Sequence, residues 1–270
     1  MFETIGFIGS GNMGGAIIKG IINSGYRKPE EIFVSDPRKE AVDKLKKDFP
    51  GIKTSSDNKS VLSAPVIVLA VKPQVYKKVI SGIKDDINKN TVVVSIAAGM
   101  EIKKIKEWFG MDIKVVRTMP NTPALVGEGM SAVCPSENVE PDETEAVKEI
   151  FKSIGRTVIM PESLMNAYTS LAGSSPAWVF MFIEALADGA VRDGIPRKDA
   201  YSIAAQAVLG SAKLVLDTAK HPGELKDMVC SPGGTTIEAL AVLEENGFRS
   251  AVIKAVGACT EKGGKLSGNN

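Results

Sequence analysis

The first 160 residues alternate short apolar runs rich in β-branched side chains with amphipathic stretches of helical spacing. The runs at residues 5–8, 31–35, 66–71, 91–96 and 114–117 are predicted strands, and the last three are almost continuously apolar. Such runs are typical of strands covered on both faces by helices. Between the second and third runs, residues 37–48 place Ala41, Leu45 and Phe49 at helical spacing. Because consecutive parallel strands join through right-handed crossovers, we predict an α/β domain with a doubly wound sheet.

Strand-like runs end near residue 160. The runs at residues 130–134 and 157–160 flank a helical pattern at residues 142–153, and we expect them to extend the same sheet. From residue 164 onward Ala, Leu, Met and Gly dominate, with Gly194, Gly247 and Gly263 as predicted helix breaks. We therefore predict two domains, an N-terminal doubly wound domain at residues 1–162 and an all-helical domain at residues 163–270.

One segment of the helical region is apolar on nearly every face. Residues 176–192 include Trp178, Phe180 and Phe182 among many aliphatic side chains. A helix that is apolar all round must be buried on all sides. The helical region is too short to bury it alone, so the segment predicts an interface between subunits.

Composition narrows the classes of partner. Lys plus Arg number 33 against 32 Asp plus Glu, a net charge of +1 that gives no electrostatic reason to bind nucleic acid or an anionic membrane. The three cysteines show neither a disulfide framework nor metal-ligand spacing, so we expect no metal and a reducing compartment. The N-terminus lacks signal-peptide features, and no run of about 18 apolar residues appears. These observations predict a soluble, cytoplasmic chain.

A glycine motif follows the first predicted strand. Residues 9–14 read GSGNMG, directly after an apolar strand and before a helix whose apolar stripe includes Ile17 and Ile21. In a dinucleotide-binding turn Gly9 allows the tight bend, Gly11 lets the backbone approach a pyrophosphate, and Gly14 allows close helix-to-strand packing. The free N–H groups of the helix N-terminus then bind the phosphates. The alternative is a glycine-rich turn without a ligand.

Two charged residues stand where the adenosine ribose is recognised, about 20 residues past the glycine motif. Asp36 favours the free 2′-hydroxyl of NAD, whereas Arg38 favours the 2′-phosphate of NADP. Asp36 could instead cap a helix that begins at Pro37. The choice between NADP and NAD stays open from these residues.

A second glycine-containing loop, SPGGTT at residues 231–236, precedes the amphipathic helix of residues 237–245. Two glycines that open a helix expose N–H groups to a carboxylate, and the hydroxyls add further donors. The alternative is an ordinary capped helix start. His221, the only histidine, is a candidate general acid, but a capping or surface role fits its position before Pro222 equally well.

Several longer phrases resemble one family. IGFIGSGNMG at residues 5–14, VKPQ at 71–74, SIAAG at 95–99 and MPNTPALV at 119–126 form one set. The second set is SSPAWVFMFIEALADGAV at residues 174–191 and HPGELKDMVCSPGGTTIEAL at 221–240. Together they resemble pyrroline-5-carboxylate reductase, along essentially the whole chain. The resemblance implies an N-terminal Rossmann domain and a helical dimerisation domain that reduce 1-pyrroline-5-carboxylate to L-proline, the last step of proline biosynthesis.

The resemblance also implies roles for individual residues. Thr236 would contact the ring nitrogen of the cyclic imine as the catalytic residue, with Ser231, Gly233, Gly234 and Thr235 around its carboxylate. The implied cofactor is NADP, and Asp36 makes NAD the alternative. The dinucleotide would lie along two sets of positions. These are Ile8, Gly9, Ser10, Gly11, Asn12, Met13, Gly14 and Asp36, followed by Asn58, Ala70, Val71, Lys72, Pro73, Ile96, Ala97 and Ala98.

The same resemblance implies how the subunits associate. In the family two subunits interlock through their helical domains, and in many members five dimers form a decameric ring. Each active site lies between the Rossmann domain of one subunit and the helical domain of the other. We therefore expect a homodimer and a decamer built from it.

Two other functions deserve comparison. A reductase of the 3-hydroxyacid type would carry a catalytic lysine near residues 171–176, which read LAGSSP and lack it. A dinucleotide-sensing protein with an inactive site would have no reason to keep both the glycine turn and the SPGGTT loop. Both readings are therefore weaker than the reductase.

Overall fold

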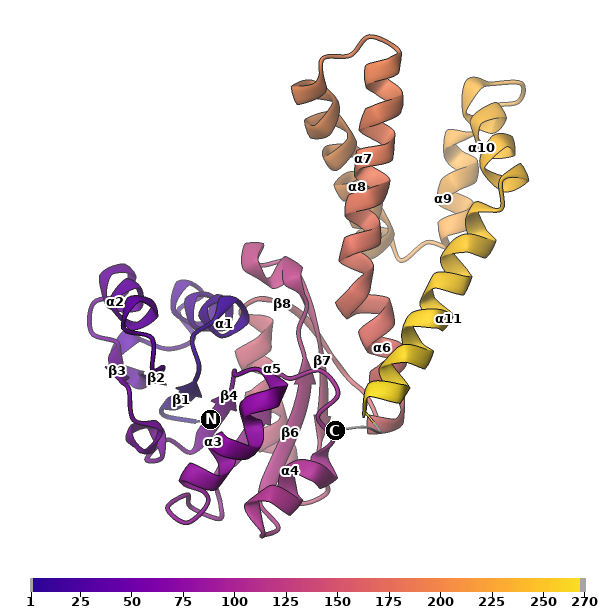
Figure 1. Cartoon of the computed structure of the whole chain (residues 1–270). Helices are drawn as coiled ribbons and strands as arrows, with labels where there is room; N and C mark the ends of the chain where they lie inside the picture. The colour runs from indigo at the N-terminus through magenta and orange to yellow at the C-terminus, as the bar shows by residue number, and fades with distance from the viewer. Residues whose placement is uncertain (1, 268–270) are drawn as a thin grey trace. The chain divides into compact units, whose positions relative to one another are not determined.

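The computed structural model describes residues 2–267. The chain divides into two compact units, of which unit 2 is Ser174–Cys259 and unit 1 is the remainder (Figure 1). Unit 1 thus holds the N-terminal part of the chain up to Gly173 and the C-terminal part from Thr260 onward. Residues 1 and 268–270, which the predicted domain limits include, lie outside the described residues.

Unit 1 contains one eight-stranded sheet in the order β3-β2-β1-β4-β5-β6-β7-β8. Strands β1 to β6 are parallel, β7 is antiparallel to β6, and β8 is parallel to β7. This order confirms the predicted doubly wound sheet, with its switch point between β1 and β4. The strands are β1 (Ile5–Ile8), β2 (Ile32–Ser35), β3 (Lys53–Ser55), β4 (Val66–Leu69), β5 (Val92–Ser95), β6 (Lys114–Met119), β7 (Gly129–Pro135) and β8 (Gly155–Ile159).

The strands follow the apolar pattern, with one exception. Every residue of β4 and β5 is buried, as their continuous apolar runs predict, and so is every residue of β1. Strand β3 has no such run, since its three residues are Lys53, Thr54 and Ser55 at the sheet edge. It pairs only with β2, and side chains that pack on one neighbour at an edge need not be apolar. The sequence prediction missed this strand.

Helices cover both faces of the sheet. One core joins α1 (Asn12–Asn23), α2 (Lys39–Asp48) and α5 (Pro141–Lys152) to the sheet, and another joins α3 (Tyr76–Ile83) and α4 (Ile102–Phe109) to its other face. Val92 and Val94 belong to the first core and Val93 to the second, as the alternation of strand side chains requires. Short helical turns are η1 (Pro29–Glu31), η2 (Asn58–Val61), η3 (Pro73–Val75), η4 (Thr122–Val126) and η5 (Glu162–Leu164).

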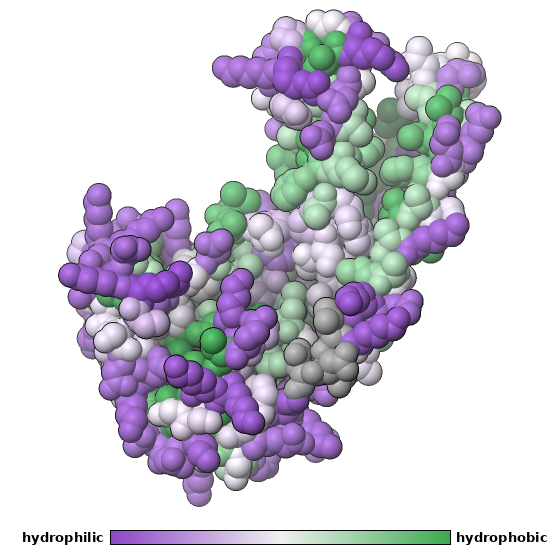
Figure 2. Space-filling view, viewed as in Figure 1, coloured by the Kyte–Doolittle hydropathy of each residue, from purple (hydrophilic) through white to green (hydrophobic). Residues whose placement is uncertain are grey.

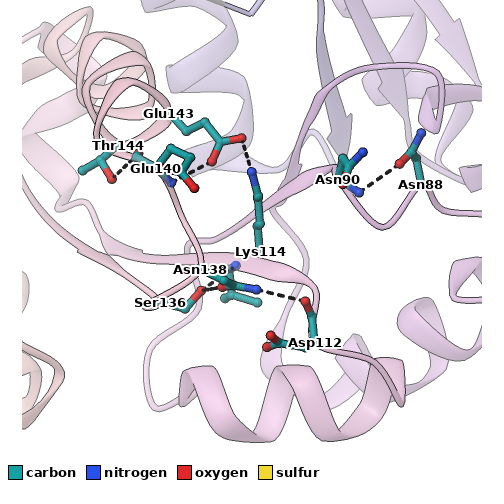
Figure 3. Close-up of polar contacts among 10 residues, drawn as sticks. Asn88, Asn90, Asp112, Lys114, Ser136, Asn138, Glu140, Glu143 and Thr144 are labelled. Carbon is teal, nitrogen blue, oxygen red and sulfur yellow. Dashed lines mark hydrogen bonds and ion pairs between the residues drawn. The ribbon is translucent and has the colours of Figure 1, made fainter.

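A polar network at the amino end of β6 holds the last part of the sheet together (Figure 3). Lys114 Nζ lies 2.7 Å from Glu143 Oε1, and the other carboxylate oxygen of Glu143 accepts the Glu140 N–H at 2.8 Å. Asn138 Nδ2 donates to the Asp112 carbonyl at 2.9 Å. These bonds join β6 to the start of α5 at the edge opposite the carboxyl ends of the parallel strands. We therefore regard this network as structural.

From Glu162 onward the described chain is helical apart from its connections. Gly194 and Gly247, both with positive φ, lie between helices as predicted, but Gly263 lies inside the last helix and the break predicted there is wrong. The elements are α6 (Met165–Tyr168), the π-helix η6 (Thr169–Ser174), α7 (Ser175–Arg192), α8 (Arg197–Thr218), α9 (Pro222–Val229), α10 (Thr235–Glu245) and α11 (Phe248–Ser267).

Unit 2 leaves most of its apolar side chains exposed, as Figure 2 shows over its helices. Phe180 and Met181 of α7 are 60% and 67% exposed. Within the described part of unit 2, the buried side chains are Ala187, Ala200, Ala204 and Leu225. An exposed apolar surface of this extent marks an interaction site. The chain alone does not bury the apolar segment, which agrees with the predicted need for a subunit interface.

The helical stretch Glu162–Arg192 is also long and apolar enough to cross a membrane by length and composition. The expectation of no spanning helix rested on uninterrupted apolar runs, and polar residues interrupt this stretch. A core helix of a water-soluble protein can meet the same criterion. By composition alone, the apolar side chains of this stretch could be covered either by a membrane or by a partner subunit.

Candidate active site

The loop between β1 and α1 has the geometry of a dinucleotide turn. Gly9 has φ +99°, and a Cβ there would lie 2.6 Å from the Ala70 carbonyl oxygen. At Gly14 a Cβ would lie 2.7 Å from the Gly9 carbonyl oxygen and 3.0 Å from the Ala70 Cβ. A Cβ on Gly11 would meet only Arg38 Nη2, at 3.9 Å. Gly9 and Gly14 therefore hold the loop against the end of β4, and Gly11 leaves its outer surface open.

The N-terminus of α1 is suited to an anion. Helix α1 begins at Asn12, and among the described residues no side chain caps it and no acidic residue occupies its first turn. The loop before it is fixed by the Gly9 N–H, which donates to the Ser35 carbonyl at 2.7 Å. Unpaired N–H groups and the positive end of the helix dipole attract phosphate. This part of the site fits the pyrophosphate of a dinucleotide.

Asp36 lies at the end of β2 and is 3% exposed. Its Oδ2 accepts the backbone N–H and the hydroxyl of Ser10, each at 2.8 Å. Its Oδ1 accepts the Arg38 backbone N–H at 2.9 Å. Burial opposes ionisation, but the hydrogen bonds from Arg38 and Ser10 outweigh it and hold the pKa of Asp36 well below its usual range. Helix α2 starts at Lys39 with Arg38 as its N-cap residue, so the alternative of Asp36 capping a helix from Pro37 is wrong.

The other residues predicted to bind the cofactor lie at the carboxyl ends of neighbouring parallel strands. Asn58 begins η2, and its Oδ1 accepts the Ser35 hydroxyl at 2.6 Å. Residues 70–73 follow β4, where the Ala70 N–H donates to the Ile8 carbonyl at 2.8 Å. Residues 96–98 follow β5, with Ala97 buried. Because β3, β2, β1, β4 and β5 are adjacent and parallel, all these positions lie at the same end of the sheet, where the strands have their carboxyl ends.

Asn121 fixes the loop of residues 119–123, which is part of the resemblance and which we expect to form a rigid wall of the active-site cleft. Its Nδ2 donates to the Ala172 carbonyl in the π-helix η6, and its Oδ1 accepts the Met130 N–H, both at 2.9 Å. A π-helix departs from the α-helical hydrogen-bond register and is often found near functional sites. Asn121 thus ties the loop after β6 to the start of the helical region.

Tyr76, which is fully buried, is a further residue of this region that the sequence pattern did not single out. Its hydroxyl donates to the Leu69 carbonyl at 2.7 Å and lies 3.1 Å from Ser95 Oγ. The Thr118 hydroxyl in turn donates to the Ser95 carbonyl at 3.0 Å. These contacts connect the carboxyl ends of β4, β5 and β6. Tyr76 therefore supports the two loops that carry residues 70–73 and 96–98.

The SPGGTT loop of unit 2 is a tight turn that opens a helix. The Gly234 N–H donates to the Ser231 carbonyl at 3.0 Å, and Gly233 has φ +68°. Gly234 is the N-cap of α10, with no side-chain cap among the described residues. Thr235 and Thr236 are the first two residues of this helix, and Thr236 is half-buried. The turn offers N–H groups and hydroxyls to a carboxylate.

His221 caps a helix. Its Nδ1 accepts the Gly223 N–H at 3.0 Å at the start of α9, and its ring is exposed. This geometry agrees with the capping role considered from sequence, and it commits Nδ1 as an acceptor. Among the described residues no group of three or more His, Cys, Asp or Glu side chains could hold a metal ion.

Comparisons with known proteins extend along the whole chain. Residues 162–266 match the family model for pyrroline-5-carboxylate reductase dimerisation, and residues 4–99 match the model "NADP oxidoreductase coenzyme F420-dependent". The pyrroline-5-carboxylate reductase of Escherichia coli (strain K12) is 51% identical over 268 residues, which cover 99% of each chain. The solved structure of a pyrroline-5-carboxylate reductase from Coxiella burnetii has a TM-score of 0.92 at 35% identity and covers 98% of both chains. That of a Plasmodium falciparum pyrroline carboxylate reductase with NADP bound has a TM-score of 0.86 at 34% identity, with the same coverage.

Proposed function

This chain belongs to the pyrroline-5-carboxylate reductase family, and on that premise we propose which of its residues bind each reactant. It is an oxidoreductase that reduces 1-pyrroline-5-carboxylate to L-proline, the last step of proline biosynthesis. The observation that carries this conclusion is 51% identity to a curated reductase over 99% of both chains. Its cofactor is NADP, which is bound in the Plasmodium falciparum relative.

The cofactor half of the proposed site lies at the carboxyl ends of the parallel strands, as described above. Residues 8–14 would hold the pyrophosphate, Asp36 and Asn58 would lie near the adenosine, and residues 70–73 and 96–98 would line the rest of the dinucleotide. The uncapped start of α1 and the glycine geometry support this placement. When bound, the reduced nicotinamide supplies the hydride, which the imine carbon receives.

The substrate half is the SPGGTT loop. Ser231, Gly233, Gly234 and Thr235 would bind the substrate carboxylate through N–H and hydroxyl donors, and Thr236 would hold the ring nitrogen. A cyclic imine that arrives protonated needs no strong protein acid, so the loop's task is to orient the ring and exclude water. His221 stays outside the catalytic set because its Nδ1 caps α9.

We base the proposed assembly on the helical region. Residues 162–266 match a dimerisation domain, which supports self-association and accounts for the exposed apolar side chains of unit 2. We place the functional domain limits at residues 1–162 and 163–270, with each site shared between the Rossmann domain of one subunit and the helical domain of its partner. We further propose that five dimers form a decamer and that the protein acts in the cytoplasm, apart from membranes and nucleic acids.

The activity is tested by mixing the purified protein with NADPH or NADH and racemic 1-pyrroline-5-carboxylate. We expect absorbance at the nicotinamide band to fall only when the imine is added, and L-proline to appear in equal amount. Folded protein that oxidises neither cofactor with this substrate would contradict the enzymatic function and leave the dinucleotide-sensing alternative.

The assembly is tested by light scattering after size-exclusion chromatography. We expect a particle of ten chains of 28.6 kDa each for the wild type. Phe180→Glu places a charge in the exposed apolar surface of α7 and should dissociate the dimers, since burying an unpaired charge is costly. Lys198→Glu, an exposed change on α8, serves as the charge control. A wild type of one chain would contradict the dimer, and one of two chains would contradict the decamer alone.

A further inference from the structure

The carboxylate of Asp36 has no acceptor capacity left for a ribose hydroxyl. Five N–H or O–H groups donate to it, two from Ser10 and three from Arg38. A carboxylate offers about four lone-pair sites. At 3% exposure the group is also closed to solvent. Recognition of a 2′-hydroxyl by Asp36 would therefore require it to give up bonds to the dinucleotide turn or to Arg38.

Arg38, in contrast to Asp36, is exposed and keeps free hydrogen-bond donors. Its Nε and Nη2 donate to the two oxygens of Asp36 at 3.0 and 2.8 Å, so the guanidinium is held in a two-point contact. Its side chain is nevertheless 60% exposed. Arg38 Nη1 makes no hydrogen bond to the described residues, so its N–H groups stay available. A planar guanidinium held along one edge presents its other edge to a ligand with little further loss of entropy.

The guanidinium also lies beside the dinucleotide turn. Nη2 is 3.9 Å from the position of a Cβ on Gly11. A groove of about 770 Å³ is lined by Ser10, Gly11 and Arg38 together with residues of α1, α2 and η4. An anion attached to the ribose of a dinucleotide on this turn would enter the same region. The exposed Arg38 would be nearer to this anion than the buried Asp36. The attraction of the anion to the guanidinium would therefore exceed its repulsion from the carboxylate.

We propose that Arg38 is the residue that selects the 2′-phosphorylated dinucleotide and that Asp36 is a positioning residue that holds the guanidinium and the Ser10 turn in place. The inference rests on the proposed function, because it concerns the cofactor site of the same enzyme. It reverses the role that an acidic residue at the end of the second strand usually has, which is to favour the free 2′-hydroxyl of NAD.

The test measures binding without substrate, so that it is independent of turnover. NADPH, NADH, 2′,5′-ADP and ADP are titrated into the wild type, Arg38→Gln, Asp36→Asn and Lys39→Gln. Arg38→Gln should weaken NADPH and 2′,5′-ADP about 10- to 100-fold, the loss of a charge-assisted phosphate contact, and change NADH and ADP less than about threefold. Lys39→Gln removes a neighbouring exposed cation and should change all four ligands less than about threefold.

Asp36→Asn separates the two roles of the carboxylate. If Asp36 positions Arg38, the variant weakens NADPH and does not strengthen NADH. Stronger NADPH binding with weaker NADH binding would show instead that Asp36 recognises the hydroxyl, and would overturn the proposal. So would an Arg38→Gln protein, folded by circular dichroism, that binds 2′,5′-ADP like the wild type. A wild type that binds both dinucleotides yet fails to reduce the imine would refute the proposed function and leave this inference standing.

Discussion

Thr236→Ala should lower kcat about 100-fold, the effect of removing one polar group that orients a reacting centre. Thr236 is the second residue of α10 and half-buried, beside a turn that has no side-chain cap among the described residues. The dinucleotide turn belongs to unit 1 and Thr236 to unit 2, so the substitution leaves the residues of the turn unaltered. The Kd for NADPH should therefore change less than about twofold. Stopped-flow single turnovers together with a fluorescence titration separate the two quantities.

Thr236→Ser is the matched control, since it keeps the hydroxyl and removes only a methyl group. We expect it to retain most of the rate. Alanine has a higher helix propensity than threonine, so the Ala variant should melt no earlier than the wild type. A loss confined to NADPH affinity, or an equal loss in the Ser variant, would mean that the hydroxyl does not orient the substrate.

The sequence predicted the sheet well because its central strands are buried on both faces. Their runs are continuously apolar, and the crossover rule then leaves few topologies. The three-residue strand β3 at the edge has only polar side chains and no pattern to detect. Helical spacing placed the start of α2 at Pro37, with Asp36 as a possible cap, but the helix begins at Lys39 and the Asp36 carboxylate bonds to Ser10 in the first loop. Such a partner, 26 residues away, is not visible in local sequence.

The residues of the candidate site likewise fall into those that local sequence predicts and those that depend on contacts between distant segments. The glycine turn is a local motif, recognised from its spacing between a strand and a helix, and Gly9 and Gly14 have the predicted tight bend and close packing. Tyr76 and Asn121 act through contacts between distant segments, Tyr76 with Leu69 and Asn121 with Ala172. No periodicity distinguishes them from ordinary buried or loop residues. The apolar segment of α7 predicted an interface between subunits, and the match of residues 162–266 to a dimerisation domain supports that prediction.

Gly14→Ala should remove most of the NADPH affinity, on the order of 100-fold, and destabilise the fold by about 1–3 kcal/mol. The added Cβ would lie 2.7 Å from the Gly9 carbonyl oxygen and 3.0 Å from the Ala70 Cβ. The Gly9 oxygen belongs to the backbone, so the collision can be relieved only if α1 moves away from the turn. That movement would displace the N–H groups of the helix N-terminus that we propose bind the pyrophosphate.

Gly15→Ala is the control within the same helix. Its Cβ would lie 3.7 Å from the Ser10 carbonyl oxygen, an ordinary contact. Replacing a helical glycine by alanine stabilises by about 0.5–1 kcal/mol, so this variant should bind NADPH normally and resist urea slightly better. Both substitutions carry the same gain in helix propensity, and the difference between them therefore measures the collision at Gly14. Equal behaviour of the two variants in urea unfolding and NADPH titration would mean that close packing of α1 on the turn does not position the cofactor.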